Sequence, residues 1–280
     1  MPIVPELEDE LGDVLDKALR NAGLTEEQLA AATGIDAGRI KDAEDYRYDF
    51  SCTELQRLAT ALGLNEVGLC ALGEGKYPLP RLPALPFALH VVGLPYGIGH
   101  VNAYAVVHPQ SGDVLLVDTG NCPETLDARW PEGLPPPAAV LVTHWDHDHA
   151  GGLPLVQLRR PARAVYAAAP PQPRPGITVL PDGEARLILG FHVRTFRTPG
   201  HTAEHNAYLV TMAEAPERGV LFSGDLVFAG SLGGAFFCCR TLLREARRVI
   251  AELPGGTVIA PGHGPLTTVE NERRYNPFLG

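Results

Sequence analysis

The sequence predicts an α/β protein of 280 residues, in which layered sheets covered by helices follow a small all-α domain. Three observations predict this fold class. Apolar residues recur at helical spacing through the first 75 residues. A proline-rich stretch then interrupts regular structure. From Phe87 onward, short β-rich runs alternate with helical stretches, which is typical of sheets packed against helices.

Residues 1–75 form the predicted helical domain. Its first helix ends at Gly23, because glycine readily adopts the left-handed conformation that follows a helix. The apolar face of this helix carries Leu11, Val14, Leu15, Ala18 and Leu19. Such a stripe indicates an amphipathic helix that buries one face.

The next part of this domain has the pattern of a helix, a glycine turn and a second helix. Thr25-Glu26-Glu27-Gln28 is a capping box that begins a short helix, which ends at the turn around Gly34. We expect a third helix from about Asp36 to Asp45 and a fourth from about Thr53 to Leu62. Over roughly Leu7 to Leu69, this arrangement resembles the helix-turn-helix of phage-repressor-like regulators.

Residues 76–86 form the predicted linker. Prolines at this density cannot continue a helix or a central strand, so the stretch is expected to be a semi-rigid spacer. The predicted domains are therefore 1–75, which is helical, and 87–280, which carries the chemistry.

The second domain contains short β-rich runs separated by turns and helices. The predicted strands are Ala88–Leu94, Asn102–His108, Val114–Asp118, Val140–Thr143, Ala164–Ala167, Ile177–Leu180, Ala185–Leu189, Val193–Arg197, Ala207–Thr211, Val220–Phe222 and Val258–Ala260. Thr241–Leu253 carries one apolar stripe at helical spacing and predicts an amphipathic helix.

A dense group of His and Asp side chains follows the apolar strand that ends at Val142. It contains His144, Asp146, Asp148 and His149. Packing does not require this density, whereas a cation needs several imidazoles and carboxylates to converge on it. The segment therefore predicts a metal site rather than a polar loop that caps the next helix.

Three later strand ends each deliver one further His or Asp. His201 lies in a Pro-Gly-His turn, Asp225 in a Ser-Gly-Asp turn and His263 in a Pro-Gly-His-Gly-Pro turn. One such residue alone would be more typical of a structural role. Together with the first group, the series favours metal binding.

The order of these residues resembles the signature of the metallo-β-lactamase superfamily, H-x-H-x-D-H followed by H, D and H. The resemblance spans about Phe87 to the C-terminus, and Val117-Asp118-Thr119-Gly120 looks like the Asp-x-Gly strand end of that superfamily. It implies an αββα sandwich with two metals at the edge of its sheets. The implied ligands are His144, Asp146 and His201 for one metal, Asp148, His149 and His263 for the other, and Asp225 as the bridge.

One position departs from the signature. Asp146 stands where the superfamily usually has a second histidine, and His147 follows one residue later. We expect Asp146 to be the ligand, because a side chain one residue further along a turn usually points elsewhere. His147 is the alternative.

Three residues, Asp118, Asp148 and His205, are expected to act in catalysis. Asp118 is expected to orient a ligand histidine through the second ring nitrogen of that histidine. Asp148 is expected to act as a metal ligand. The resemblance implies that His205 supports the ligands from behind, since this position is often His in the glyoxalase II-like group.

The segments around Asp225 and His263 resemble those of short bacterial glyoxalase II-like hydrolases. The resemblance implies a metal-bridging hydroxide that attacks a thioester of the hydroxyacylglutathione type, or a related ester. The alternatives are a lactonase or phosphodiesterase on the same site, and a mononuclear iron persulfide dioxygenase. The expected cofactors are two divalent metal ions, zinc first, with manganese or iron as alternatives.

The distribution of charge argues against a DNA-binding regulator. Residues 1–75 contain six Lys and Arg and sixteen Asp and Glu, a formal charge of −10, and residues 76–280 are balanced. Affinity for DNA comes largely from neutralising phosphates, so a domain of this charge would be repelled. We expect the helical domain to contact protein instead, as a homodimer interface or as a cover for the active site.

The N-terminus is acidic where a signal peptide would be basic, and no apolar run reaches about 18 residues. We therefore expect a cytoplasmic protein without a membrane partner. The five cysteines form no C-x-x-C pair and are expected to be free thiols. The expected partner is a small-molecule thioester or ester.

Overall fold

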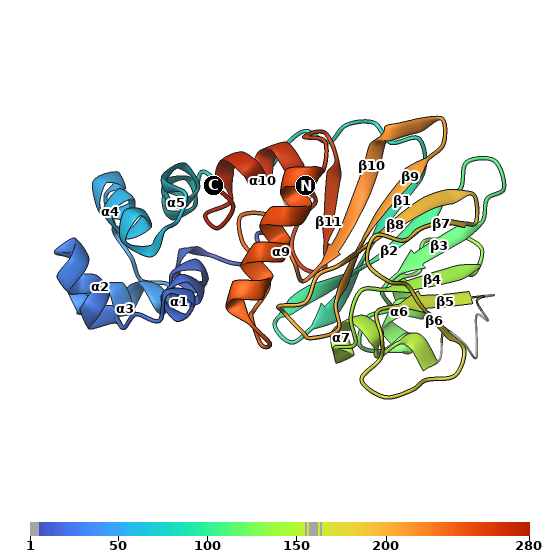
Figure 1. Ribbon diagram of the computed structural model, residues 1–280, viewed down its shortest axis with the longest axis horizontal. Coiled ribbons are helices and arrows are strands. Elements are labelled where there is room, and N and C mark those ends of the chain that lie inside the picture. The colour runs from blue at the N-terminus through green and yellow to red at the C-terminus, as the bar shows by residue number, and fades with distance from the viewer. Residues whose placement is uncertain (1–5, 155, 157–161, 163) are drawn as a thin grey trace.

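Two sheets packed face to face, with helices on both outer faces, form an αββα sandwich (Figure 1). The computed structural model describes residues 6–154, 156, 162 and 164–280. Within these residues each sheet has six strands. The predicted fold class is confirmed, and a helical region precedes the sandwich.

The first sheet contains β1 to β6 in chain order, with antiparallel pairs from β1 to β3 and parallel pairs from β3 to β6. Its strands are β1 (Ala88–Tyr96), β2 (Gly99–Val107), β3 (Val114–Val117), β4 (Ala139–Val142), β5 (Ala164–Ala167) and β6 (Ile177–Val179). Strands β3 and β4 are buried along their whole length. This explains why they appear in the sequence as continuous apolar runs.

The second sheet runs in the order β12-β11-β10-β9-β8-β7. Its strands are β7 (Ala185–Ile188), β8 (Phe191–Arg197), β9 (Asn206–Met212), β10 (Ala215–Gly224), β11 (Val258–Pro261) and β12 (Thr267–Thr268). Only β10 and β11 are parallel among the described pairs of this sheet. Their carboxyl ends therefore emerge at the same edge.

Three hydrophobic clusters correspond to the layers of the molecule. The cluster between the sheets includes Tyr104 and Phe222. On the outer face of the first sheet, Leu126 of α6 (Pro123–Arg129) packs near the short helix α7 (His147–Ala150). On the outer face of the second sheet lie α9 (Cys239–Glu252) and α10 (Val269–Tyr275). Helix α9 begins two residues before the predicted helix at Thr241.

The N-terminal region contains α1 (Leu11–Ala22), α2 (Glu26–Thr33), α3 (Ala37–Glu44), α4 (Cys52–Leu62) and α5 (Glu66–Gly73). Gly23 ends α1 in the left-handed conformation, and the capping box at Thr25 is formed. Helix α5 was not predicted. No helix among the described residues is both long and apolar enough to span a bilayer.

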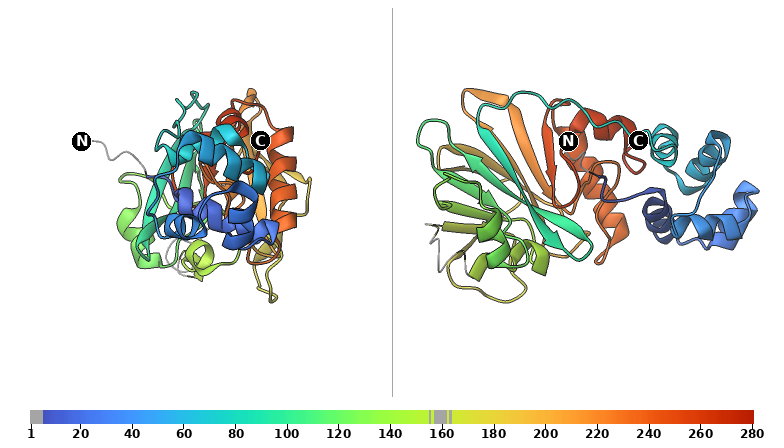
Figure 2. Two further views of the ribbon diagram at one scale, coloured as in Figure 1. Left: turned by 90° about the vertical axis from the view of Figure 1, so that its left-hand side faces the viewer. Right: turned by 180° about the vertical axis from the view of Figure 1, so that it is seen from behind.

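The helical region packs against the α9 and α10 side of the sandwich (Figure 2). Its apolar core is continuous with that side, since one cluster contains Leu15 and Leu69 together with Ile250 and Phe278. At the contact, the Asn65 amide donates a hydrogen bond to the Pro277 carbonyl at 2.7 Å. The helical region and the sandwich therefore share one core.

The proline-rich segment is fixed to the sandwich along part of its length. The buried hydroxyl of Tyr77 hydrogen bonds to the carboxylate of Glu272, and burial together with that carboxylate raises the pKa of Tyr77. The side-chain amide of Asn271 donates to the Pro78 carbonyl at 3.1 Å. These contacts place the segment against α10.

Gly68 allows α5 to approach the end of α10, because a Cβ at this position would overlap the Tyr275 carbonyl oxygen. We expect Gly68→Ala to lower the free energy of unfolding by about 1–3 kcal/mol, the usual cost of overpacking. Thermal or urea denaturation measures this change. Gly256→Ala is the matched control, since an added Cβ there meets no atom within 4 Å. An equal stability of the two variants would contradict the proposed close contact.

Candidate metal centre

Strand ends from both sheets meet at one edge of the sandwich and carry the predicted ligands. His144 follows β4, and α7 then presents Asp148 and His149. From the second sheet, Asp225 follows β10 and His263 follows β11. His201 lies in the turn after β8. The fold therefore brings together segments that are far apart in the sequence.

The first group of donors contains His144, Asp146 and His201. The Asp146 carboxylate lies 3.2 Å from Nε2 of His201 and 3.8 Å from Nε2 of His144. These separations are suited to three ligand atoms around one cation. The group coincides with the first metal site expected from the sequence.

The second group contains Asp148, His149 and His263. The Asp148 carboxylate lies 3.3 Å from Nε2 of His263 and 3.8 Å from Nε2 of His149. Both histidines are buried. This group coincides with the expected second site.

Asp225 lies between the two groups. Its Oδ1 is 3.3 Å from Nε2 of His149, and its Oδ2 is 3.5 Å from Nε2 of His201 and 3.7 Å from Nε2 of His263. One carboxylate thus faces histidines of both groups. This is the arrangement that a bridging ligand requires.

Asp146 and His147 differ in where they lie. Asp146 belongs to the first donor group, whereas His147 is exposed at the start of α7 and joins none of the donor groups found among the described residues. The geometry therefore favours Asp146 over the alternative ligand. The Asp146 side chain is 41% exposed, so a ligand bound here would remain in contact with the solvent.

The second ring nitrogen of each ligand histidine has a partner. Nδ1 of His144 lies 3.0 Å from the Thr143 hydroxyl, and Nδ1 of His149 lies 2.9 Å from the Asp118 carboxylate. Nδ1 of His201 donates to the Gly234 carbonyl at 2.6 Å, and Nδ1 of His263 donates to the His100 carbonyl at 2.9 Å. A proton held on Nδ1 leaves the lone pair on Nε2, the atom that faces the other donors. The rings are therefore oriented for metal binding.

Asp118 has a positive φ of 57°, in the left-handed region that Asp tolerates better than most residues. Its carboxylate accepts from the Thr143 amide at 2.8 Å and from the Thr143 hydroxyl at 2.8 Å, besides contacting His149. These bonds link the end of β3 to the end of β4. Asp118 thus contacts a residue of the second donor group and does not itself join a donor group found among the described residues.

His205 is completely buried behind Asp225. Its Nε2 accepts a hydrogen bond from the Asp225 backbone amide at 3.1 Å, and its Nδ1 lies 2.7 Å from the Thr198 hydroxyl. Burial, together with neighbouring His201, lowers the pKa of His205 to about 3, so the ring is neutral. Both ring nitrogens are engaged, which gives His205 a role in positioning Asp225 rather than in proton transfer.

Three buried donor atoms indicate that the residues fit metal ions. Nε2 of His144, Nε2 of His149 and Oδ1 of Asp225 have no hydrogen-bond partner in the described structure. An unsatisfied buried polar atom costs about 1–3 kcal/mol, and a cation would satisfy all three. Gly262 leaves room for this cluster, since a Cβ there would overlap Asp225 and His149.

The electrostatic state of the donors also suits a cation. Burial and the nearby imidazole of His149 hold the pKa of His144 well below its ordinary value, so its ring is neutral. Burial alone would raise the pKa of Asp225, but His149 and His263 outweigh it and hold that pKa well below its ordinary value. Burial alone would lower the pKa of His149, His201 and His263, but the neighbouring carboxylates outweigh it and raise those pKa values. The site therefore offers ionised Asp225 and neutral His144, and a cation bound to the other three rings would displace their protons.

A cavity of about 410 Å³ opens over the donors. Residues that the sequence did not predict as part of the site line its mouth: Glu8, Asp9 and Lys17 of the helical region and the aromatic residues Tyr96, Phe228 and Phe236. The Lys17 amino group pairs with Asp9 and donates to the Leu232 carbonyl at 2.7 Å. The helical region thus forms one wall of the cavity.

A sequence model of the Metallo-beta-lactamase superfamily matches residues 96–263. The chain belongs to the metallo-beta-lactamase superfamily. The matched residues include the His and Asp donor groups of the candidate metal site. The match begins after the helical region, which therefore lies outside the family's shared domain.

Individual relatives agree with this assignment. The hydroxyacylglutathione hydrolase of Citrobacter koseri is 32% identical over 162 residues, which cover 56% of this chain and 60% of that protein. The crystal structure of BLEG-1, a B3 metallo-beta-lactamase, is 29% identical with a TM-score of 0.56, covering 69% of this chain and 99% of its own. TTHA1623, crystallised in a di-iron-bound form, is 32% identical with a TM-score of 0.53 and covers 67% and 99%.

Asp118→Asn tests how strongly ligand orientation depends on the carboxylate. The amide oxygen can still accept from Thr143, but the amide nitrogen faces Nδ1 of His149 as a donor and disfavours the proton there. We expect metal affinity to fall about 10- to 100-fold, as measured by titration of the apoprotein. The control, Asp45→Asn on the exposed surface, should bind normally. Unchanged affinity in Asp118→Asn would remove the proposed orienting role.

Proposed function

We propose that the enzyme hydrolyses a small-molecule thioester of the hydroxyacylglutathione type, or a related ester. The observation that carries this proposal is the pair of donor groups joined by Asp225 at the base of an open cavity. The similarity to a hydroxyacylglutathione hydrolase supports the thioester class.

Both donor groups are complete, which favours two metals over one. His144, Asp146 and His201 offer three ligand atoms, as do Asp148, His149 and His263. A mononuclear iron dioxygenase would need only one of the groups. We propose zinc as the metal, with manganese or iron as alternatives, because imidazole and carboxylate donors accept all three.

Different residues of the site would bind the metals and orient the metal ligands during hydrolysis. Divalent cations bound here would lower the pKa of a water molecule and polarise the substrate carbonyl. The three-atom donor groups and Asp225 would hold those cations, while Asp118 and His205 fix the orientation of His149 and Asp225. Phe236, which is largely exposed at the mouth of the cavity, contacts His201, with ring centroids 5.2 Å apart.

The charge of the mouth disfavours a phosphodiester substrate. Glu8 and Asp9 line the cavity, and Lys17, the only Lys or Arg among the described residues that line it, is paired with Asp9. A phosphodiester carries its negative charge on the reacting group itself, whereas a glutathione thioester carries its carboxylates away from the reacting carbonyl. A neutral carbonyl at the metals fits this surface better.

We propose that the helical region serves the active site rather than DNA, although its pattern resembles a helix-turn-helix. Its formal charge is −10, and it places three of its residues in the mouth of the cavity. Tight binding of duplex DNA at physiological salt would contradict this proposal.

Removal of the metals should abolish hydrolysis. We expect chelator-treated enzyme to lose activity on S-lactoylglutathione and to recover it with zinc or manganese, while bis(p-nitrophenyl) phosphate remains a poor substrate. Metal content per chain is measured in parallel. One iron per chain, or faster turnover of the phosphodiester, would overturn the proposal.

His263→Ala and Asp225→Ala should reduce both bound metal and turnover. We expect a loss larger than the roughly 10- to 100-fold typical of residues that only orient a ligand. Circular dichroism should show folded protein, because both side chains lie at strand ends rather than between the sheets. A variant with full activity would show that its residue is not a ligand.

Asp146→His should shift metal preference. An imidazole replaces a carboxylate oxygen, and nitrogen donors favour zinc over manganese more than oxygen donors do. We expect the ratio of zinc to manganese affinity to rise in the variant, as measured by competition between the two metals. The matched variant His147→Asp should leave the ratio unchanged. The opposite pattern would identify His147 as the ligand.

A further inference from the structure

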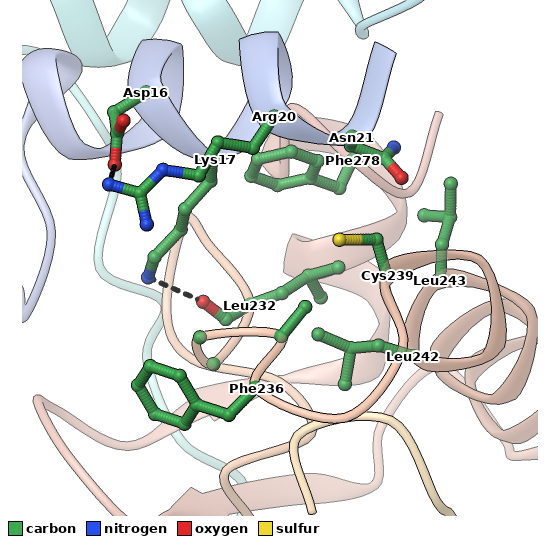
Figure 3. Close-up of a pocket in the computed structure, with 13 residues that line it drawn as sticks. Asp16, Lys17, Arg20, Asn21, Leu232, Phe236, Cys239, Leu242, Leu243 and Phe278 are labelled. Atoms are coloured by element: carbon green, nitrogen blue, oxygen red, sulfur yellow. Dashed lines mark hydrogen bonds and ion pairs between the residues drawn. The ribbon is translucent and has the colours of Figure 1, made fainter. Parts of the chain in front are cut away.

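A second cavity, of about 200 Å³, lies between α1 and α9 (Figure 3). We refer to it as the α1–α9 cavity. Its apolar lining consists of Leu232, Ala235, Phe236, Leu242, Leu243 and Phe278. Lys17, Arg20 and Asn21 of α1 form the opposite wall. The helical region therefore encloses a space that the sandwich alone would leave open.

This cavity adjoins the metal centre. Lys17, Gly234 and Phe236 line both cavities. The same short segment also orients a ligand, because the Gly234 carbonyl accepts the hydrogen bond from His201. A group that extends from the metals past Phe236 would thus enter the α1–α9 cavity.

The cations beside the cavity are already paired. Lys17 binds Asp9 and the Leu232 carbonyl, and Arg20 lies 2.7 Å from the Asp16 carboxylate. An anionic group entering here would have to compete with these partners. The lining instead matches an apolar group, whose burial is favourable and needs no partner.

We propose that the α1–α9 cavity binds the apolar acyl chain of the substrate, with the scissile carbonyl at the metal centre. The inference rests on the proposed ester hydrolysis. A cavity of about 150 Å³ accommodates benzene, so the available space suits an acyl chain of about six carbons. Because α1 precedes the family's matched region, the helical region supplies a wall of this cavity that the shared domain does not contain.

Chain-length dependence tests the assignment. Each buried methylene should raise kcat/KM roughly fourfold. Hexanoate has four more methylenes than acetate, so kcat/KM for p-nitrophenyl hexanoate should exceed that for p-nitrophenyl acetate by about 200-fold if all four are buried. Cys239 lines the cavity at the start of α9, and Cys239→Phe should lower this hexanoate-to-acetate ratio at least tenfold. Cys52→Phe is the matched control, since Cys52 is exposed at the start of α4.

A binding measurement separates this inference from the proposed function. In the wild-type holoenzyme, sodium hexanoate should slow alkylation of Cys239 by N-ethylmaleimide more than sodium acetate does, while Cys52 reacts at an unchanged rate. Mass spectrometry with single-residue resolution reads both thiols. Protection of Cys239 without hydrolysis of either ester would refute the proposed function but support the cavity assignment. No protection by hexanoate, or an unchanged ester ratio in Cys239→Phe, would overturn the assignment.

Discussion

Buried hydrogen bonds between the two sheets hold the metal-binding edge together. The Tyr104 hydroxyl of β2 donates to the Pro261 carbonyl at the end of β11 at 2.6 Å, and the Tyr208 hydroxyl of β9 donates to the Val142 carbonyl at the end of β4 at 2.9 Å. His263 and His144 follow these two strand ends. Each bond contributes only about 0.5–1.5 kcal/mol net, but together they set the spacing between ligands that come from different sheets.

The cost of this arrangement is concentrated at a few residues. Asp118 adopts a positive φ, and three buried donor atoms lack partners in the described structure. Such features are unfavourable for folding alone and are typical of functional sites. Metal binding would offset part of this cost. The fold and the metal site are therefore thermodynamically linked, since each stabilises the conformation that the other requires.

Local patterns predicted layered sheets covered by helices and the donor residues, whereas the αββα sandwich was implied by the resemblance to the superfamily. His144 and Asp225, for example, directly follow apolar strands, so their convergence follows from the topology. A cover for the active site was one of two roles expected of the helical region, but the residues that form the wall could not be predicted, because the contact from Lys17 to Leu232 joins residues 215 positions apart. Helix α5 was missed because its glycines weaken helix propensity. Gly68 is needed for the close contact of α5 with α10, and only the tertiary structure reveals that contact.

The shared hydrophobic cluster limits how the chain can be divided. Leu15 and Leu69 of the helical region belong to the same cluster as Ile250 and Phe278 of the sandwich. A fragment cut at the proline-rich segment would leave part of this apolar surface exposed to water, and exposed patches of this kind promote aggregation. The helical region therefore also shields this apolar surface from water. An engineered minimal enzyme would need polar replacements on α9 and at the C-terminus before it could be produced without the first five helices.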